Sequence, residues 1–336
     1  MMLTLLMVAA LAGFAAGTGI LSSSSARVIA SDNSAAVIST ADIAQEPVIS
    51  DVAAIEPAST DSAAVLQTVS GRWGVDRVNA AEAIQVAGTL STVLVAVIDT
   101  GIDESHASLQ GKVIASIDFT GSGTTADENG HGTHMAGTIA AIAPNATFLN
   151  VKAADERGRC DTETVATAIR WAADNGAQVI NISLEVAPSI DLQNAISHAW
   201  RMGAVIVAAA GNSGTTLAAY PAAYIETIAV AGTNQDNGLA VLSNHGDWVD
   251  IAAPGQKIQG EFPGGQMGYE TGTSPAAAHV SGVAALLCSL AEDGSGDGLT
   301  NDEVRLTLET SAMPLGASGT GSGLVDALAA VQALAI

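Results

Sequence analysis

The chain has 336 residues, enough for one large domain preceded by a leader. Hydrophobic residues make up 48% of it, charged residues only 13%, and its 35 glycines argue against a coiled coil or a long helical repeat. The formal net charge of −23 with 11 basic residues excludes the positive surface of a nucleic-acid-binding protein. It leaves solubility, a saline habitat or cationic substrates as explanations of the acidity.

The chain begins with an apolar leader and a low-complexity segment. Residues 1–19 hold an apolar run that ends in small residues, as in a secretory signal peptide, and we therefore expect a secreted protein. The run is too short to predict a membrane span. Because no Lys or Arg precedes it, an uncleaved N-terminal anchor is the alternative. Residues 20–68 are rich in Ala, Ser, Asp and Val without a period, which predicts a linker or pro-segment.

From residue 69 to the C-terminus, apolar β-branched runs alternate with helical stretches. Continuous apolar strands separated by helices predict a three-layer α/β domain with a mostly parallel central sheet and helices on both faces. The predicted strands are 93–98, 113–117, 147–151, 178–183, 205–210, 227–231 and 248–252. The predicted helices are 133–142, 163–175, 192–202, 275–290 and 301–310.

Three short motifs in this domain each place a reactive group beside glycine. They are Asp99-Thr100-Gly101, Asn129-Gly130-His131-Gly132-Thr133-His134 and Gly272-Thr273-Ser274. A serine hydroxyl becomes a nucleophile when an imidazole takes its proton and a carboxylate orients that imidazole. Asp99 directly follows a predicted strand, at the edge of a parallel sheet where ligands bind. These motifs therefore indicate nucleophilic catalysis by Ser274.

The order Asp, His, Ser, together with the residues around each motif, resembles the subtilisin-like serine proteases (subtilases, the peptidase S8 family) from about Trp73 to the C-terminus. The resemblance implies a subtilisin-like fold and a serine endopeptidase of the EC 3.4.21 class that cleaves proteins or peptides. In that family Ser274 would attack the peptide carbonyl, His131 would shuttle the proton and Asp99 would orient His131. No cofactor is required, and we expect a monomer.

The same resemblance identifies the oxyanion hole. Asn212 corresponds to the asparagine whose side-chain N–H stabilises the oxyanion, and the backbone N–H of Ser274 is the second donor. The proline that usually comes three positions after the serine has moved to Pro275, with Ala278 in its place. Ser274 as N-cap and Pro275 as first helical residue would be a favourable helix start.

A substrate-binding segment is implied at Ser183, Leu184 and Glu185, whose backbone would pair with the substrate as an added strand, and at Gly211. Glu185 stands where the family usually has glycine. Two interpretations compete for its carboxylate. It points to solvent, or it lines the specificity pocket and favours a basic side chain just before the cleaved bond.

Metal-ligand patterns are weak in this sequence. His131 and His134 lie three residues apart, but no Glu or Cys completes a zinc site, so we predict no metal and a packing role for His134. Residues 293–298 resemble half of a calcium loop without its final acidic ligand, so calcium has weak support. We favour an acidic surface loop, followed by a capping box between Thr300 and Glu303.

The two cysteines are far apart in the sequence. Spacing alone does not decide whether Cys160 and Cys288 pair, and the apolar run around Cys288 predicts a buried thiol.

Two other functions, an aspartic protease and an inactive scaffold, are alternatives for this sequence. Hydrophobic-Asp-Thr-Gly is also typical of aspartic proteases, but that chemistry needs two such carboxylates and the chain has one Asp-Thr-Gly. The other alternative is a catalytically inactive subtilisin-like scaffold that binds without cleaving.

Overall fold

The computed structural model describes residues 72–334. The predicted leader (1–19), the predicted linker (20–68) and the predicted domain start at residue 69 all lie outside these described residues. Within residues 72–334, no helix is both long enough and apolar enough to cross a membrane.

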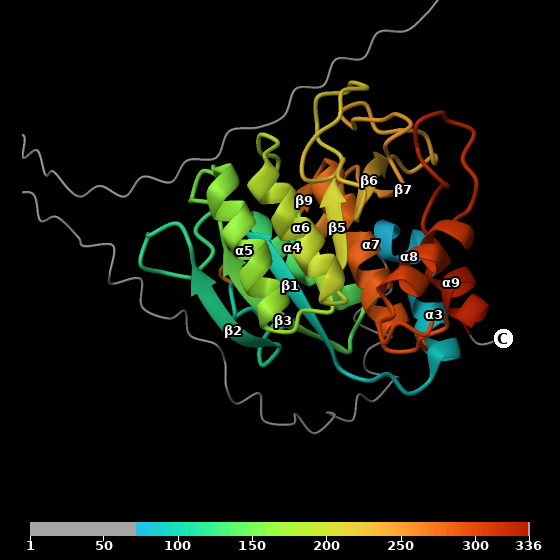
Figure 1. Cartoon of the computed structure of the whole chain (residues 1–336), viewed down its shortest axis with the longest axis horizontal. Coiled ribbons are helices and arrows are strands. Elements are labelled where there is room, and N and C mark those ends of the chain that lie inside the picture. The colour runs from blue at the N-terminus through green and yellow to red at the C-terminus, as the bar shows by residue number, and fades with distance from the viewer. Residues whose placement is uncertain (1–71, 335–336) are drawn as a thin grey trace, which may run out of the picture. The chain divides into compact units, whose positions relative to one another are not determined.

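A seven-stranded sheet forms the centre of the domain (Figure 1), and every neighbouring pair of strands is parallel. Its spatial order is β2 (Val113–Asp118), β3 (Ala146–Lys152), β1 (Val93–Asp99), β4 (Val179–Ile182), β5 (Val205–Ala209), β6 (Thr227–Thr233) and β7 (Ile251–Pro254). The central strands are buried almost throughout, because helices cover both of their faces. The predicted parallel α/β architecture is confirmed.

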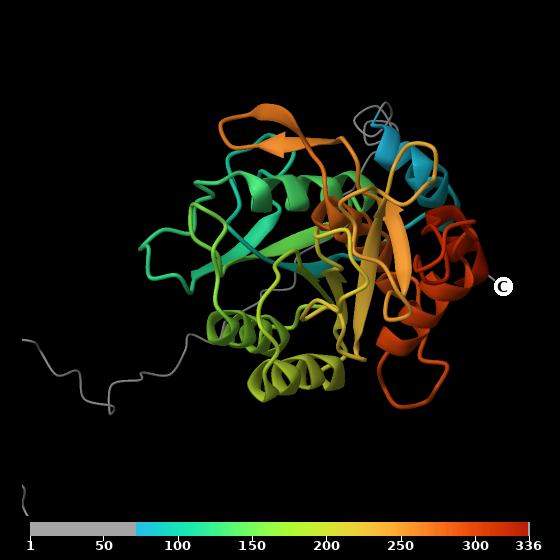
Figure 2. The same ribbon diagram turned by 90° about the horizontal axis from the view of Figure 1, so that it is seen from above.

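Helices cover the two faces of the sheet separately (Figure 2). Alternate side chains of one strand serve two cores: Val95 and Val97 of β1 belong to one, Ala96 and Ile98 to the other. The first core is closed by α3 (Ala80–Ala87), α4 (His131–Ile142), α7 (Thr273–Cys288), α8 (Asn301–Thr310) and α9 (Ala327–Leu334). The second is closed by α5 (Thr162–Asp174) and α6 (Ile190–Arg201). This period-two alternation lets one strand pack against the helices on both faces of the sheet.

Some elements were not predicted. The antiparallel hairpin of β8 (Ile258–Phe262) and β9 (Gln266–Glu270) packs over α4 and leads directly into α7. Helices α2 (Trp73–Arg77), α3 and α9 were also missed. The last strand of the main sheet begins at Ile251 instead of residue 248.

Candidate active site

The side chains of Asp99 and His131 contact each other where the end of a strand lies beside the start of a helix. Asp99 is the last residue of β1, and His131 is the first residue of α4. His131 Nδ1 lies 2.7 Å from Asp99 Oδ1, and the same oxygen accepts the backbone N–H of Thr100 at 2.7 Å. The Asp99 side chain is fully buried, whereas that of His131 is 19% exposed. With Nδ1 held by the carboxylate, Nε2 is the nitrogen left for proton transfer.

The turn that presents His131 is built around Asp127, which the sequence analysis did not single out. Its buried carboxylate accepts hydrogen bonds from Thr133 N at 2.9 Å and from Thr100 Oγ1 at 2.8 Å. Thr100 Oγ1 in turn accepts the N–H of Gly132 at 3.0 Å. A side chain at Gly132 would collide with the carbonyl oxygen of Gly101. The Asp99 and His131 motifs are therefore joined by a buried polar network.

The electrostatic surroundings favour the charged form of His131. Burial opposes the imidazolium, but the Asp99 carboxylate outweighs that effect, with further contributions from Glu270 and Asp127, and the pKa of His131 is raised to about 9. Glu270 is the last residue of β9, four positions before Ser274. Its own pKa is raised by burial and by the Asp99 and Asp127 charges, although His131 lowers it. Glu270 is thus a further acidic group near the imidazole that sequence reasoning missed.

Ser274 lies in the first turn of α7 and is 7% exposed. The helix begins at Thr273 with Gly272 as its N-cap, so the predictions of Ser274 as N-cap and Pro275 as first helical residue were wrong. The helix begins earlier because the Thr273 N–H already has a side-chain acceptor, Asn212 Oδ1. Among the residues that the structure describes, no hydrogen bond joins Ser274 Oγ to His131. The N-terminal end of a helix favours developing negative charge at this position.

Thr273 connects the helix to the loop that carries Asn212. Asn212 Oδ1 accepts hydrogen bonds from Thr273 N at 2.8 Å and from Thr273 Oγ1 at 3.1 Å. Thr273 Oγ1 also accepts the N–H of Gly211 at 3.0 Å. With its oxygen engaged in this way, the exposed Asn212 side chain has its NH₂ group left to donate.

The predicted substrate residues follow two neighbouring strands. Ser183, Leu184 and Glu185 come after β4, and Gly211 comes after β5. Ser183 Oγ lies 3.4 Å from the carbonyl oxygen of Ser274, which links this segment to α7. Glu185 is exposed, and a β-carbon added at Gly211 would lie 2.9 Å from Glu185 Oε2. The structure therefore brings the two segments together beside Asn212.

His134 packs in the core, as predicted. It is fully buried, its Nε2 lies 3.0 Å from the carbonyl oxygen of Ile258, and its ring contacts Phe262 edge-on. Burial is the main cause that lowers the pKa of His134 to about 4. No cluster of three or more His, Cys, Asp or Glu side chains within residues 72–334 could hold a metal ion.

The acidic loop at residues 293–298 is organised by hydrogen bonds to its own carboxylate. Asp293 accepts hydrogen bonds from the N–H groups of Gly296 and Gly298, so its oxygens are used by the loop itself. The predicted capping box was wrong, because Thr300 makes no side-chain cap. Glu303 reaches back instead to the N–H groups of Gly294 and Ser295.

The cysteines do not pair. Cys160 and Cys288 are both free thiols. Cys288 is half-buried where a buried thiol was predicted, and burial raises the pKa of its thiol to about 12. For Cys160, burial and the nearby Asp99 charge raise the pKa to about 11. Neither thiol has the lowered pKa of a reactive cysteine.

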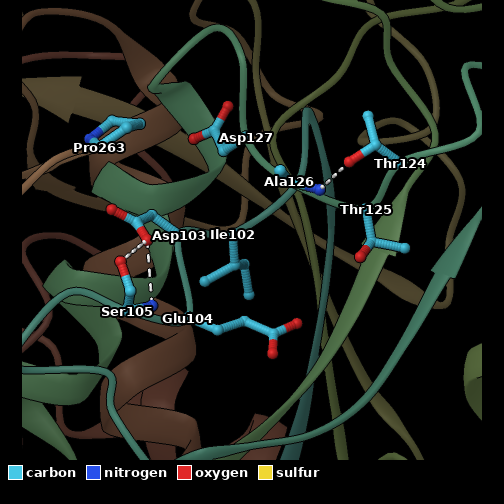
Figure 3. Close-up of a pocket in the computed structure, with 9 residues that line it drawn as sticks. All are labelled: Ile102, Asp103, Glu104, Ser105, Thr124, Thr125, Ala126, Asp127 and Pro263. Carbon is cyan, nitrogen blue, oxygen red and sulfur yellow. Dashed lines mark hydrogen bonds between the residues drawn. The ribbon is translucent and has the colours of Figure 1, made fainter.

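A cavity of about 520 Å³ has Asp127 in its lining (Figure 3). It is lined by Ile102, Asp103, Glu104, Ser105, Thr124, Thr125, Ala126, Asp127 and Pro263. The Asp103 carboxylate accepts hydrogen bonds from Ser105 there and fixes the local loop. None of the residues expected to be catalytic lines this cavity.

The sequence of this chain is similar to those of known proteases. Residues 91–329 match the model of the subtilase family, peptidase S8. The chain is 42% identical over 238 residues to a thermophilic serine proteinase of Bacillus sp. (strain AK1), covering 67% of this chain but 58% of that protein. It is 38% identical over 277 residues to thermitase of Thermoactinomyces vulgaris, covering 78% of this chain and 96% of that protein. It is 40% identical over 271 residues to subtilisin BL of Lederbergia lenta, covering 77% and 98%.

Proposed function

The chain belongs to the subtilase family of subtilisin-type serine endopeptidases, and from that premise we propose that Asp99, His131 and Ser274 form its catalytic triad. The observation that carries this proposal is the 2.7 Å hydrogen bond between His131 Nδ1 and Asp99 Oδ1. The packing of α4 against α7 supports it, because His131 begins one helix and Ser274 lies in the first turn of the other.

In the proposed reaction, Ser274 Oγ attacks the carbonyl carbon of the substrate while its proton passes to His131 Nε2. Asp99 keeps the Nδ1–H in place and stabilises the imidazolium. The tetrahedral oxyanion accepts hydrogen bonds from the Asn212 NH₂ and the Ser274 N–H. The C–N bond then breaks, and His131 returns the proton to the leaving amine. Water then attacks the acyl-enzyme ester while its proton passes to His131 Nε2. The ester C–O bond breaks, His131 returns the proton to Ser274 Oγ, and the product with its new carboxyl group leaves.

Protein or peptide substrates would run along Ser183–Glu185 as an added strand. We place the peptidase domain at residues 69–336, which contain the whole family match. Residues 1–19 would direct secretion, or anchor the chain if uncleaved, and residues 20–68 would be a linker or pro-segment. The enzyme would act as a monomer without a catalytic cofactor.

The test is hydrolysis of casein by the purified protein, the Ser274→Ala variant and a matched Ser295→Ala control in an exposed loop. We expect Ser274→Ala to lose roughly 10⁶-fold in kcat, as triad serine replacements do in subtilisin, and Ser295→Ala to keep full activity. Hydrolysis that survives in Ser274→Ala would contradict the proposal. A folded wild-type protein without hydrolysis would favour the inactive scaffold.

A further inference from the structure

Glu185 places a carboxylate beside the predicted oxyanion hole. The segments after β4 and β5 leave the sheet side by side, because the two strands are parallel neighbours. Glu185 stands on the first segment, and Gly211 and Asn212 stand on the second. A β-carbon built on Gly211 would lie 2.9 Å from Glu185 Oε2, so the carboxylate points across the gap toward Gly211.

The Glu185 carboxylate has no polar partner among the residues that the structure describes. Within residues 72–334, Glu185 takes part in no hydrogen bond and no ion pair. The amide of Asn244 also faces Gly211, but its Nδ2 donates to the carbonyl oxygen of Ala210 at 2.9 Å. The next nearest atom is the methyl group of Ala219, which would be 3.3 Å from the same added β-carbon. An acceptor with two free oxygens is thus held between two chain segments.

The substrate would bring a side chain to this place. If, as proposed above, Asn212 holds the oxyanion and the substrate backbone follows Ser183–Glu185, the residue whose carbonyl is attacked lies between the two segments. Its side chain then extends toward Gly211 and meets the Glu185 carboxylate. Gly211 has φ +96 and carries no side chain, and a β-carbon there would lie only 2.5 Å from Asn244 Nδ2 and 2.9 Å from Glu185 Oε2, so its backbone lies directly against the carboxylate.

The negative charge that develops during the reaction also favours a basic side chain on the substrate. A carboxylate near the oxyanion hole repels the negative charge that develops on the substrate oxygen. An ammonium or guanidinium on the substrate cancels that repulsion and also pairs with Glu185. Both effects act in the transition state, so they raise kcat/KM for basic substrates relative to uncharged ones.

We propose that Glu185 makes this protease select peptides with Arg or Lys immediately before the cleaved bond. The proposal rests on the proposed function, since it needs the substrate to be held by Asn212 and Ser274. It assigns the exposed carboxylate a specificity role in place of a purely solvent-facing one.

The experiment measures kcat/KM for peptides that differ only in the residue before the cleaved bond: Arg, Lys, Met, Gln and Glu. We expect the wild type to favour Arg and Lys over Met and Gln by at least about tenfold, with Glu the poorest. Glu185→Gln should reduce the basic preference to within about threefold and improve the Glu peptide. The matched control is Glu82→Gln, an exposed carboxylate in α3 that should leave the ratios unchanged.

Two results would overturn the proposal. One is a wild type that does not favour Arg or Lys, and the other is an unchanged preference in Glu185→Gln. A fluorophosphonate probe run in parallel distinguishes failure of the Glu185 proposal from failure of the proposed protease function. Labelling at Ser274 with cleavage indifferent to the basic residue would reject the role of Glu185 alone. Absence of labelling and of cleavage of every peptide would reject the proposed function as well.

Discussion

His131 Nδ1 and Asp99 Oδ1 lie 2.7 Å apart, with the carboxylate fully buried at the end of β1 and the imidazole partly exposed at the start of α4. The two residues come from motifs 32 positions apart, and Asp127 and Thr100 join those motifs behind them. Because Nδ1 is held by the carboxylate, Nε2 is the nitrogen of His131 that is left to exchange a proton with Ser274.

Replacing the carboxylate should damage the reaction and leave the fold intact. In Asp99→Asn, the amide can hold His131 in the wrong tautomer, and we expect kcat to fall about 10⁴-fold, as the same replacement does in a Ser-His-Asp triad on an unrelated fold. The control is Asp103→Asn, whose carboxylate serves a loop and should leave kcat within a fewfold of wild type. Steady-state kinetics with one peptide measure kcat for both variants. A fall in kcat of less than about tenfold in Asp99→Asn would contradict the role of Asp99 in the triad.

The pH dependence should reflect the raised pKa of His131. Only the neutral imidazole accepts the serine proton, so kcat/KM should rise with pH and reach its plateau above a midpoint near 9, well above the ordinary value of 6.5. Glu270→Gln removes a negative charge that favours the imidazolium, so its midpoint should move to lower pH. A midpoint at or below 6.5, or one that rises in Glu270→Gln, would show that the surrounding charges do not act as described.

The oxyanion donor should affect kcat more than KM. In Asn212→Ala we expect kcat to fall by about 10²–10³, the loss measured for this donor in subtilisin, with little change in KM. Thr273→Val removes the hydroxyl that bonds Asn212 Oδ1 and Gly211 N, and should cost kcat less than Asn212→Ala does. If Thr273→Val cost more, Thr273 would have a role beyond orienting the amide.

Two buried histidines should make the fold sensitive to acid. His134 and His279 are fully buried, and burial, the larger effect, lowers the pKa of each to about 4. Since the unfolded chain takes up these protons first, the free energy of unfolding should fall as the pH drops from about 6.5 to about 4, by up to about 3 kcal/mol for each histidine.

The folded pKa of His131 is raised instead, so the stability that it contributes is lost between about 6.5 and 9, outside that acid window. Denaturant unfolding of Ser274→Ala at a series of pH values measures the slope without self-digestion. His279→Gln in the same background should remove about half of it, and a slope equal to that of the parent would exclude His279 as a cause.

Much of the architecture was predictable because it rests on local patterns. The buried strands read as continuous apolar runs, and six of the seven in the main sheet agree with the predicted ranges to within two residues at each end. The hairpin of β8 and β9 was missed because β9 is largely exposed and lacks such a run. Its stability comes from distant contacts, among them the ion pair at 2.8 Å between Arg72 and the buried Glu261.

The reactive groups of the site were likewise visible in the sequence, but their supports were not. Asp127 and Glu270 act through hydrogen bonds or charges whose partners are set by the fold, and no local motif marks them. Thr273 stands in the serine motif, but its contact with Asn212 is likewise set by the fold. The wrong helix start at Ser274 has the same origin. A tertiary acceptor, Asn212 Oδ1, satisfies the Thr273 N–H, and α7 starts two residues earlier than predicted.

The most direct test of the catalytic assignment is covalent labelling of the purified protein by a fluorophosphonate, with the modified residue identified by peptide mass spectrometry. We expect one phosphonylated residue, Ser274, with labelling that rises with pH alongside the neutral fraction of His131 and disappears in Ser274→Ala. Labelling at another residue, or a folded and fully processed protein that does not react, would contradict it.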